Sequence, residues 1–420
     1  MNVDGARLRE DIERTAEFGR VESEEGRGRT VRAGTEANRT AREYFLTRLE
    51  DAGLTVRIDA VGNIVGRWVP ESADPDLPPV AAGSHLDSVP EGGIFDGPLG
   101  VYAALEAVRT MQELNRKPER PIAVVCFTEE EGGRFGSGLL GSSVATGQRS
   151  VDEALALEDG EGRTLENALE GIGFRGEGRV NAAGWEAWLE LHIEQSDRLE
   201  TVGVPVGIVT DITGITHCEV SIRGEANHAG ATPMDDRTDA LCAASEFVLD
   251  VERAASEVVT SESETAVGTV GSLSVSPNAT NVIPETIECG VDIRDTHYKT
   301  MNELASRAKS SLARLGAERG VETEFDREFD VEPVSMADRC REAAREAATE
   351  AEITTMALHS GAAHDTMHVA RVTDAGMLFA PSRDGISHNP KEWTDWDDCE
   401  TATQVLCGAM ARLAGSSLDG

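Results

Sequence analysis

The sequence has little lysine. Only four of its 39 basic residues are lysines, the other 35 are arginines, and 76 acidic residues bring the formal charge to −37. Such a charge repels duplex nucleic acid and anionic membrane surfaces, so neither is expected as a partner. A carboxylate-rich surface with little lysine is typical of proteins that work in molar salt, where the Debye length shrinks to about 3 Å. The composition therefore predicts a halophilic protein, with an acidic mesophilic protein as the alternative.

Long apolar runs and closely paired cysteines are also missing. The run from Pro121 to Phe127 is typical in length, whereas a membrane span needs about 20 residues. The residues after Met1 predict an amphipathic helix rather than a secretory leader. Seven scattered cysteines without a CxxC pair indicate neither a disulfide framework nor a zinc knuckle. We therefore expect a cytoplasmic protein with reduced, mostly buried thiols.

The order of strand and helix signals predicts an inserted domain. Residues 1–210 alternate apolar strands with helices, which is typical of an α/β layer with a mostly parallel sheet flanked by helices. Residues 211–329 instead predict an α+β module with long helices and one-sided strands, and the α/β pattern returns in residues 330–420. Within the first part, the Glu- and Gly-rich stretch 152–178 predicts an exposed, irregular excursion.

Ionisable side chains follow several of the apolar strands. Ligands of open α/β sheets bind at the carboxyl ends of the strands, and a mixture of imidazole and carboxylate is the donor set that zinc and similar divalent metals prefer. Each residue alone could be a satisfied polar side chain or surface charge, but together they predict a metal site. They are His85 and Asp87 in GSHLDSV, Asp96 in GGIFDGPLG, Glu129 to Glu131 in TEEEG, His192 and Gln195 in ELHIEQ, and His388 in GISHNP.

With these motifs in order and spacing, the chain resembles the carbamoylase branch of the binuclear metallopeptidases and amidohydrolases. That branch includes N-carbamoyl-L-amino-acid hydrolase, beta-ureidopropionase and allantoate amidohydrolase. The resemblance runs from about Thr35 to the last helix and also covers NHAGATPM, TNVIP, DIRD and SGAAHD. It implies a zinc-peptidase-like catalytic domain with an inserted dimerisation, or lid, domain.

The resemblance implies two divalent metal ions per subunit. Zinc is the first candidate, and manganese and cobalt are the alternatives, since all three accept this donor set. Asp96 would bridge the two ions. His85 and His192 would complete one site, and Glu131 and His388 the other.

Three further residues near these ligands take roles from the resemblance. Glu130 looks like the general base that takes a proton from the water held between the metals and passes it to the leaving nitrogen. Asp87 would orient the imidazole of His85. His192 stands where the peptidase and deacylase branches are expected to carry a carboxylate, which favours a ureido or carbamoyl substrate over a peptide.

The resemblance also implies which residues contact the substrate. His228 and Asn281 would polarise the scissile carbonyl, and Arg294 would clamp the substrate carboxylate. Gln195 would contact the ureido group, with His364 near the same end of the site. Because His228 typically reaches the partner's active site in the relatives, a homodimer built through the inserted domain is implied.

The predicted function is a metal-dependent amidohydrolase that cleaves the linear C–N bond of an N-carbamoyl-L-amino acid or of an allantoate-like ureido acid. The partner is then a small ureido or carbamoyl substrate. One alternative is an aminoacylase or dipeptidase of the same superfamily. Another, from a different class, is a catalytically inactive binding or scaffold dimer.

Overall fold

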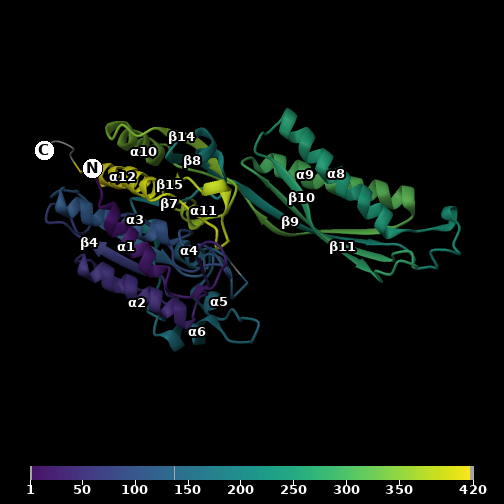
Figure 1. The fold of residues 1–420 in the computed structure, drawn as a ribbon, viewed down its shortest axis with the longest axis horizontal. Coiled ribbons are helices and arrows are strands. Elements are labelled where there is room, and N and C mark those ends of the chain that lie inside the picture. Colours follow the sequence, from purple (N-terminus) through teal and green to yellow (C-terminus); the bar gives the residue numbers. More distant parts are fainter. Residues whose placement is uncertain (1, 137, 417–420) are drawn as a thin grey trace. The chain divides into compact units, whose positions relative to one another are not determined.

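The computed structural model describes residues 2–136 and 138–416, and the chain forms two compact units (Figure 1). One unit comprises the residues up to Thr210 together with those from Ser335 onward, and the other comprises Asp211–Val334. The inserted unit therefore ends at Val334 instead of residue 329, because its last long strand continues to Val331.

The larger unit is built on a nine-stranded mixed sheet. Its order is β13-β8-β15-β7-β5-β6-β4-β3, and β14 pairs with β8 outside this path. The central strands β15, β7, β5 and β6 run parallel, and the β3–β4, β4–β6 and β15–β8 pairs are antiparallel. The strands are β3 (Thr55–Ile58), β4 (Ile64–Trp68), β5 (Val80–His85), β6 (Ile122–Phe127), β7 (Ala187–Ile193), β8 (Val206–Ile212), β13 (Val334–Ser335), β14 (Thr355–Ser360) and β15 (Ala375–Ala380).

The helices of this unit begin at recognisable signals. The side chain of Thr35 accepts the N–H of Asn38 at the start of α2, and α3 begins with Pro98, whose missing N–H costs nothing there. The helices are α1 (Gly5–Thr15), α2 (Glu36–Asp51), α3 (Pro98–Glu113), α4 (Leu140–Thr146), α5 (Val151–Leu155), α6 (Leu165–Ile172), α7 (Arg198–Val202), α10 (Asp338–Glu350), α11 (Asp365–Val369) and α12 (Trp396–Leu413); a small ribbon adds β1 (Arg20–Val21) and β2 (Gly28–Arg29).

The mixed α/β class is confirmed, with one local correction. The stretch 152–178 is not wholly irregular, since it contains most of α5 and all of α6. Thr164 caps α6 by accepting the N–H of Asn167, and Leu165 and Leu169 bury its apolar side. No helix within residues 2–136 and 138–416 combines the length and apolar character needed to cross a membrane.

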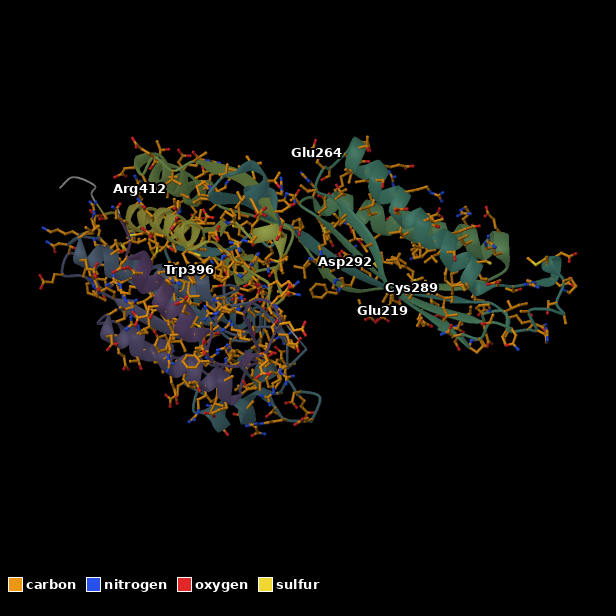
Figure 2. The ribbon with its side chains drawn as sticks, in the orientation of Figure 1. Glu219, Glu264, Cys289, Asp292, Trp396 and Arg412 are labelled. Carbon is orange, nitrogen blue, oxygen red and sulfur yellow. The ribbon has the colours of Figure 1, made fainter. Side chains whose placement is uncertain are left out.

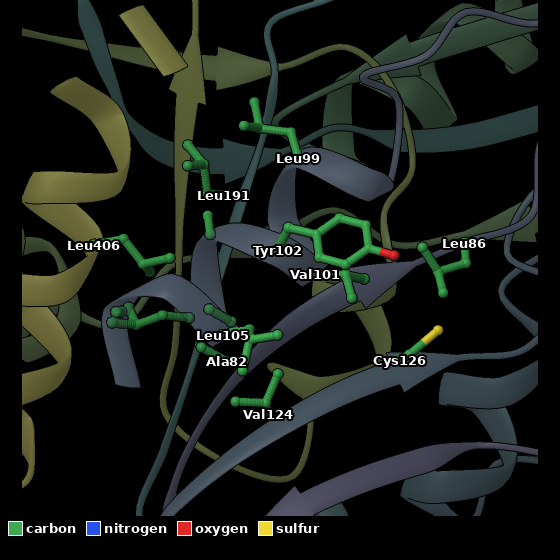
Figure 3. Close-up of a cluster of buried hydrophobic side chains, with 14 of the residues drawn as sticks. Ala82, Leu86, Leu99, Val101, Tyr102, Leu105, Val124, Cys126, Leu191 and Leu406 are labelled. Carbon is green, nitrogen blue, oxygen red and sulfur yellow. The ribbon is translucent and has the colours of Figure 1, made fainter. Parts of the chain in front are cut away.

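The core of the larger unit supports the central strands. Every residue of β5, β6 and β7 is buried. Figure 3 shows side chains from these strands packed with side chains of α3 and α12; among those labelled are Ala82, Val124, Leu191, Leu99, Tyr102, Leu105 and Leu406. A close-packed interior resists deformation, so the carboxyl ends of these strands form a rigid platform.

The inserted unit is an antiparallel four-stranded sheet with the order β10-β11-β9-β12. Residues alternate in burial, so that Cys289 is buried among the core residues, whereas Glu219 and Asp292 lie on the more exposed face (Figure 2). Helices α8 and α9 contribute apolar residues to the same core. The elements are β9 (Gly214–Arg223), β10 (Val267–Ser276), β11 (Thr286–Asp295), β12 (Glu322–Val331), α8 (Ala240–Ser261) and α9 (Tyr298–Arg319).

Candidate metal centre

The carboxyl ends of the parallel strands bring five predicted metal ligands together. They form two groups that share one carboxylate: His85, Asp96 and His192 in the first, and Asp96, Glu131 and His388 in the second. Within each group the possible ligand atoms all lie within 4.8 Å of one another. The carboxylate of Asp96 can therefore bridge the two positions.

The first group is buried, and both of its imidazoles face Asp96. Nε2 of His85 lies 3.4 Å and Nε2 of His192 lies 3.3 Å from Oδ1 of Asp96. Nδ1 of His85 lies 3.1 Å from the backbone carbonyl oxygen of Asp87, and Nδ1 of His192 lies 3.1 Å from that of Ile193. Because a carbonyl only accepts, Nδ1 carries the proton of a neutral ring, and this tautomer presents the lone pair of Nε2 to a metal ion.

The second group opens to solvent. Nε2 of His388 lies 3.5 Å from Oδ2 of Asp96 and 3.3 Å from Oε2 of Glu131. The side chain of His388 is 50% exposed, whereas that of Glu131 is buried and accepts the N–H of Val89 at 3.3 Å. One metal position is thus enclosed and the other is accessible to an incoming molecule.

The electrostatics of the site fit divalent cations. Burial raises the pKa of Glu130 and of Glu131 well above the ordinary value, and neighbouring carboxylates add to the shift. Burial also opposes the ionisation of Asp96, but His192 and His85 hold its pKa well below the usual range. In addition, Nε2 of His85 and Nε2 of His192 are buried without a hydrogen-bond partner among the described residues. Crowded carboxylates and free imidazole nitrogens are a donor set for borderline divalent metals.

One ligand and two residues beside the ligands adopt a left-handed backbone. The φ angles are 55° at Glu129, 60° at Gln195 and 54° at His388. This conformation is costly for residues with a side chain and concentrates at functional sites. Glu129 also anchors the loop that follows it, because its Oε1 accepts the N–H groups of Arg134 at 2.7 Å and Phe135 at 2.9 Å.

Asp87 lies behind the ligands and connects two of them. Its backbone carbonyl, and not its carboxylate, accepts the bond from Nδ1 of His85; Oδ1 is 3.8 Å from the same nitrogen. Its Oδ2 instead accepts the N–H of Glu131 at 3.1 Å. Asp87 therefore holds one ligand from each group.

The two predicted substrate contacts of the larger unit also lie beside the metal ligands. Nε2 of Gln195 donates to Oδ2 of Asp96 at 2.9 Å. The His364 ring lies 4.6 Å from that of His192, and its Nε2 is 3.0 Å from Oγ of Ser360. Burial and the neighbouring His192 lower the pKa of His364 well below its ordinary value.

In the inserted unit, His228 and Asn281 lie together. The N–H of Ala229 donates to the Asn281 carbonyl at 3.0 Å, and His228 pairs with Val282 in an isolated bridge. Nδ1 of His228 accepts the N–H groups of Gly230 and Ala231, at 3.0 and 3.1 Å. A neutral ring then carries its proton on Nε2, which is free to donate.

Arg294 lies near the end of β11 that is farther from His228 and Asn281. Asn281 precedes β11, which begins at Thr286, whereas Arg294 is the penultimate residue of that strand. Eight residues of extended chain span about 27 Å. The guanidinium is engaged by Asp292, with Nε 3.0 Å from Oδ1 and Nη2 3.0 Å from Oδ2. Arg294 and His228 of one chain are therefore too far apart to contact the same small molecule.

Three residues that touch Asp96 or its loop were not predicted, namely Arg29, Ser387 and Glu392. Ser387 and Glu392 flank the His388 ligand in GISHNPKE, so their place in the motif was an available signal. Arg29 has no such signal, because its contacts are with residues 58 to 67 positions away.

Comparison with known proteins places the chain in a family. The model of Peptidase family M20/M25/M40 matches residues 81–412. The chain is 39% identical to an N-carbamoyl-L-amino-acid amidohydrolase of Paenarthrobacter aurescens over 97% of both sequences, and 35% identical to an allantoate amidohydrolase of Bacillus subtilis over 88% of both. A crystal structure of a hydantoinase/carbamoylase family amidase from Burkholderia multivorans has a TM-score of 0.92 at 34% identity and covers 99% of both chains. The chain therefore belongs to Peptidase family M20/M25/M40, whose members are metal-dependent hydrolases, and to the hydantoinase/carbamoylase amidases.

Proposed function

We propose that the protein is an amidohydrolase that cleaves the linear C–N bond of an N-carbamoyl-L-amino acid or of a related ureido acid such as allantoate. The observation that carries this proposal is the pair of ligand groups sharing Asp96, with the carboxylate of Glu130 beside them. The names of the full-length relatives support the substrate class.

Two divalent ions fit the two groups. His85, Asp96 and His192 would hold one ion, and Asp96, Glu131 and His388 the other. Zinc is the first candidate, with manganese and cobalt as alternatives. Bound there, such ions would polarise the scissile carbonyl and make a water molecule more acidic.

Glu130 supplies the proton transfer. Its Oε2 lies 3.6 Å from Nε2 of His85, so the carboxylate borders the metal position without belonging to either group. From that place it accepts the proton of the attacking water and delivers it to the leaving nitrogen. The carbamate released from the substrate then decomposes to ammonia and carbon dioxide.

The remaining residues bind the substrate. The protonated Nε2 of His228 and the amide of Asn281 donate hydrogen bonds to the oxygen that gains negative charge. Gln195 contacts the ureido group, and His364 lies at the same end of the site. Arg294 exchanges Asp292 for the substrate carboxylate, which offers the same bidentate geometry.

We propose that the active form is a homodimer assembled through the inserted unit. One chain cannot bring both His228 and Arg294 to one small substrate, since about 27 Å of strand separates them. In a two-fold dimer, His228 and Asn281 of one chain can serve the site of the other.

Complementation between two inactive variants tests this arrangement. We expect His228→Ala and Arg294→Ala each to be inactive as homodimers. In a mixed dimer one site keeps its own Arg294 and receives an intact His228 from the partner, so co-expression at equal levels should restore about a quarter of the wild-type activity. The measurement is turnover of the co-purified mixture, with the separately expressed variants mixed just before assay as the control. Absence of recovery would contradict action across the dimer.

A substrate panel tests the chemical class. We expect faster hydrolysis of an N-carbamoyl-L-amino acid, or of allantoate, than of the matching N-acetyl amino acid or dipeptide. The reason is that Oε1 of Gln195 is buried without a hydrogen-bond partner among the described residues and can accept an N–H of the ureido group that an acetyl group lacks. Release of ammonia and of free amino acid are measured in parallel. Faster deacetylation would favour an aminoacylase, and no turnover by a metal-loaded dimer would favour a binding or scaffold protein.

We further propose that the protein works in the cytoplasm of a halophilic organism. The net charge of −37 and the scarcity of lysine support this proposal. Assays are therefore best run in molar potassium chloride, where the carboxylate surface is screened.

A further inference from the structure

We propose that Arg29 and Glu392 are positioning residues that hold the two successive peptide groups on either side of the Asp96 Cα, and so set how its carboxylate is shared between the two ligand groups. The inference deepens the proposed function, because it rests on a metal centre bridged by Asp96. Neither residue belongs to either group.

Glu392 holds the N–H side of Asp96. Its side chain is 1% exposed, and its Oε1 accepts the backbone N–H groups of Phe95 at 2.9 Å and Asp96 at 3.1 Å. The fit leaves no spare room, since a Cβ added at Gly93 would lie 2.1 Å from the same oxygen. Hydrogen bonds from two successive N–H groups to one oxygen define the orientation of the peptide group between them.

Glu392 also reaches the Asp96 carboxylate through a hydroxyl. Oγ of Ser387 lies 3.0 Å from Oδ2 of Asp96 and 3.3 Å from Oε2 of Glu392. The residue that follows Ser387 is the ligand His388. Glu392 therefore links the backbone of Asp96, through the hydroxyl of Ser387, to the segment that carries the ligand His388.

Arg29 holds the carbonyl side of Asp96. Its side chain is 0% exposed, and it donates from Nη2 to the carbonyl of Asp96 at 3.4 Å and to that of Asp87 at 3.3 Å, and from Nε to that of Gly93 at 3.2 Å. Burial lowers the pKa of the Arg29 guanidinium, and the negative charges of Glu392, Asp96 and Asp87 oppose that shift. A buried charge of this kind is retained only where its partners compensate it.

The peptide orientation matters because the two oxygens of Asp96 face different groups. Oδ1 lies near His85 and His192, whereas Oδ2 lies 3.5 Å from Nε2 of His388. A rotation of the peptide between residues 95 and 97 moves both oxygens and cannot preserve both sets of distances. We call Arg29 and Glu392 together the Asp96 clamp. Loss of this clamp is therefore expected to disturb the sharing of Asp96 between the two groups before it disturbs either group alone.

The test uses Mn²⁺ as the probe, because two bridged Mn²⁺ ions are magnetically coupled and give a different electron paramagnetic resonance spectrum from isolated ions. Metal-free full-length protein is titrated with Mn²⁺, and bound metal and the coupled fraction are measured for the wild type, Glu392→Leu and Arg29→Met. We expect the wild type to bind two coupled ions, and both variants to lose the coupled signal with at least about tenfold weaker binding of one ion.

Two further variants separate positioning from stability. Glu392→Gln keeps an oxygen that accepts the N–H groups of Phe95 and Asp96, and should retain the coupled signal even if Glu392→Leu fails to fold. Asp59→Leu is the matched control, because Asp59 is also a buried carboxylate that accepts backbone N–H groups, those of Val61 and Val180, but lies outside both ligand groups. It should lower the melting temperature and leave the coupled signal unchanged.

The outcomes are distinguishable. A wild-type protein without two coupled ions would overturn the proposed metal centre and with it the clamp. A wild-type protein with coupled ions, together with coupled ions in Glu392→Leu and Arg29→Met, would overturn the clamp alone. Loss of coupling in Asp59→Leu as well would reduce the effect to general destabilisation and also overturn it.

Discussion

Glu130→Gln is expected to lower kcat by about 10³-fold, within the range of roughly 10²–10⁴ that a lost general base costs. The amide keeps the size of the side chain but cannot accept the proton of the attacking water. Because Glu130 belongs to neither ligand group, metal content should stay at the wild-type level. Turnover of an N-carbamoyl substrate and metal analysis of the same sample provide the measurement.

Glu129→Gln is the control for this substitution. Glu129 is the adjacent buried glutamate, but its Oε1 accepts the N–H groups of Arg134 and Phe135 and so faces the following loop. An amide oxygen can still accept these bonds, so we expect a change in kcat of no more than a few fold. Turnover near the wild-type rate in Glu130→Gln would remove Glu130 from the proton transfer.

Asp96→Ala is expected to abolish turnover and to remove most of the bound metal, because Asp96 is the only residue common to both ligand groups of the described chain. Metal binding to the folded state raises the melting temperature by mass action. Added Zn²⁺ or Mn²⁺ should therefore raise the melting temperature of the metal-free wild type but not that of Asp96→Ala. Calorimetry with and without metal measures the difference.

Removal of metal from the wild type provides the reversible counterpart. A chelator should abolish activity, and Zn²⁺ or Mn²⁺ added back should restore it, whereas Asp96→Ala should remain inactive at every metal concentration. Full activity in thoroughly metal-free wild type would rule out the proposed mechanism.

The sequence predicted the central elements well because their signals are local. β5 and β6 are short, mostly apolar runs, and the helical signals at 35–51 and 99–114 agree with α2 and α3 to within a residue. In contrast, β12 was not predicted, because five of its ten residues are acidic and only Phe325, Phe329 and Val331 are apolar. Its place in the sheet depends on pairing with β9, which no local pattern reveals.

The same distinction between local and long-range signals applies to the candidate metal centre. The types of ligand and their place after apolar strands could be read from the motifs, and the structure brings those residues together. The motifs did not show that the Asp87 carbonyl orients His85, or that Asp292 engages Arg294. They also did not show that β11 separates Arg294 from His228. This separation depends on the direction and register of the strand.

The sequence by itself thus determined which metal-donor atoms are present and which strands they follow, because strand and helix periodicities depend on neighbouring residues. Only the tertiary structure decided how the donors are oriented. Arg29 and Glu392 come from opposite ends of the chain to hold the two sides of Asp96. Such contacts depend on how the β5, β6 and β7 layer packs against its helices, and packing sets distances between residues that no local pattern relates.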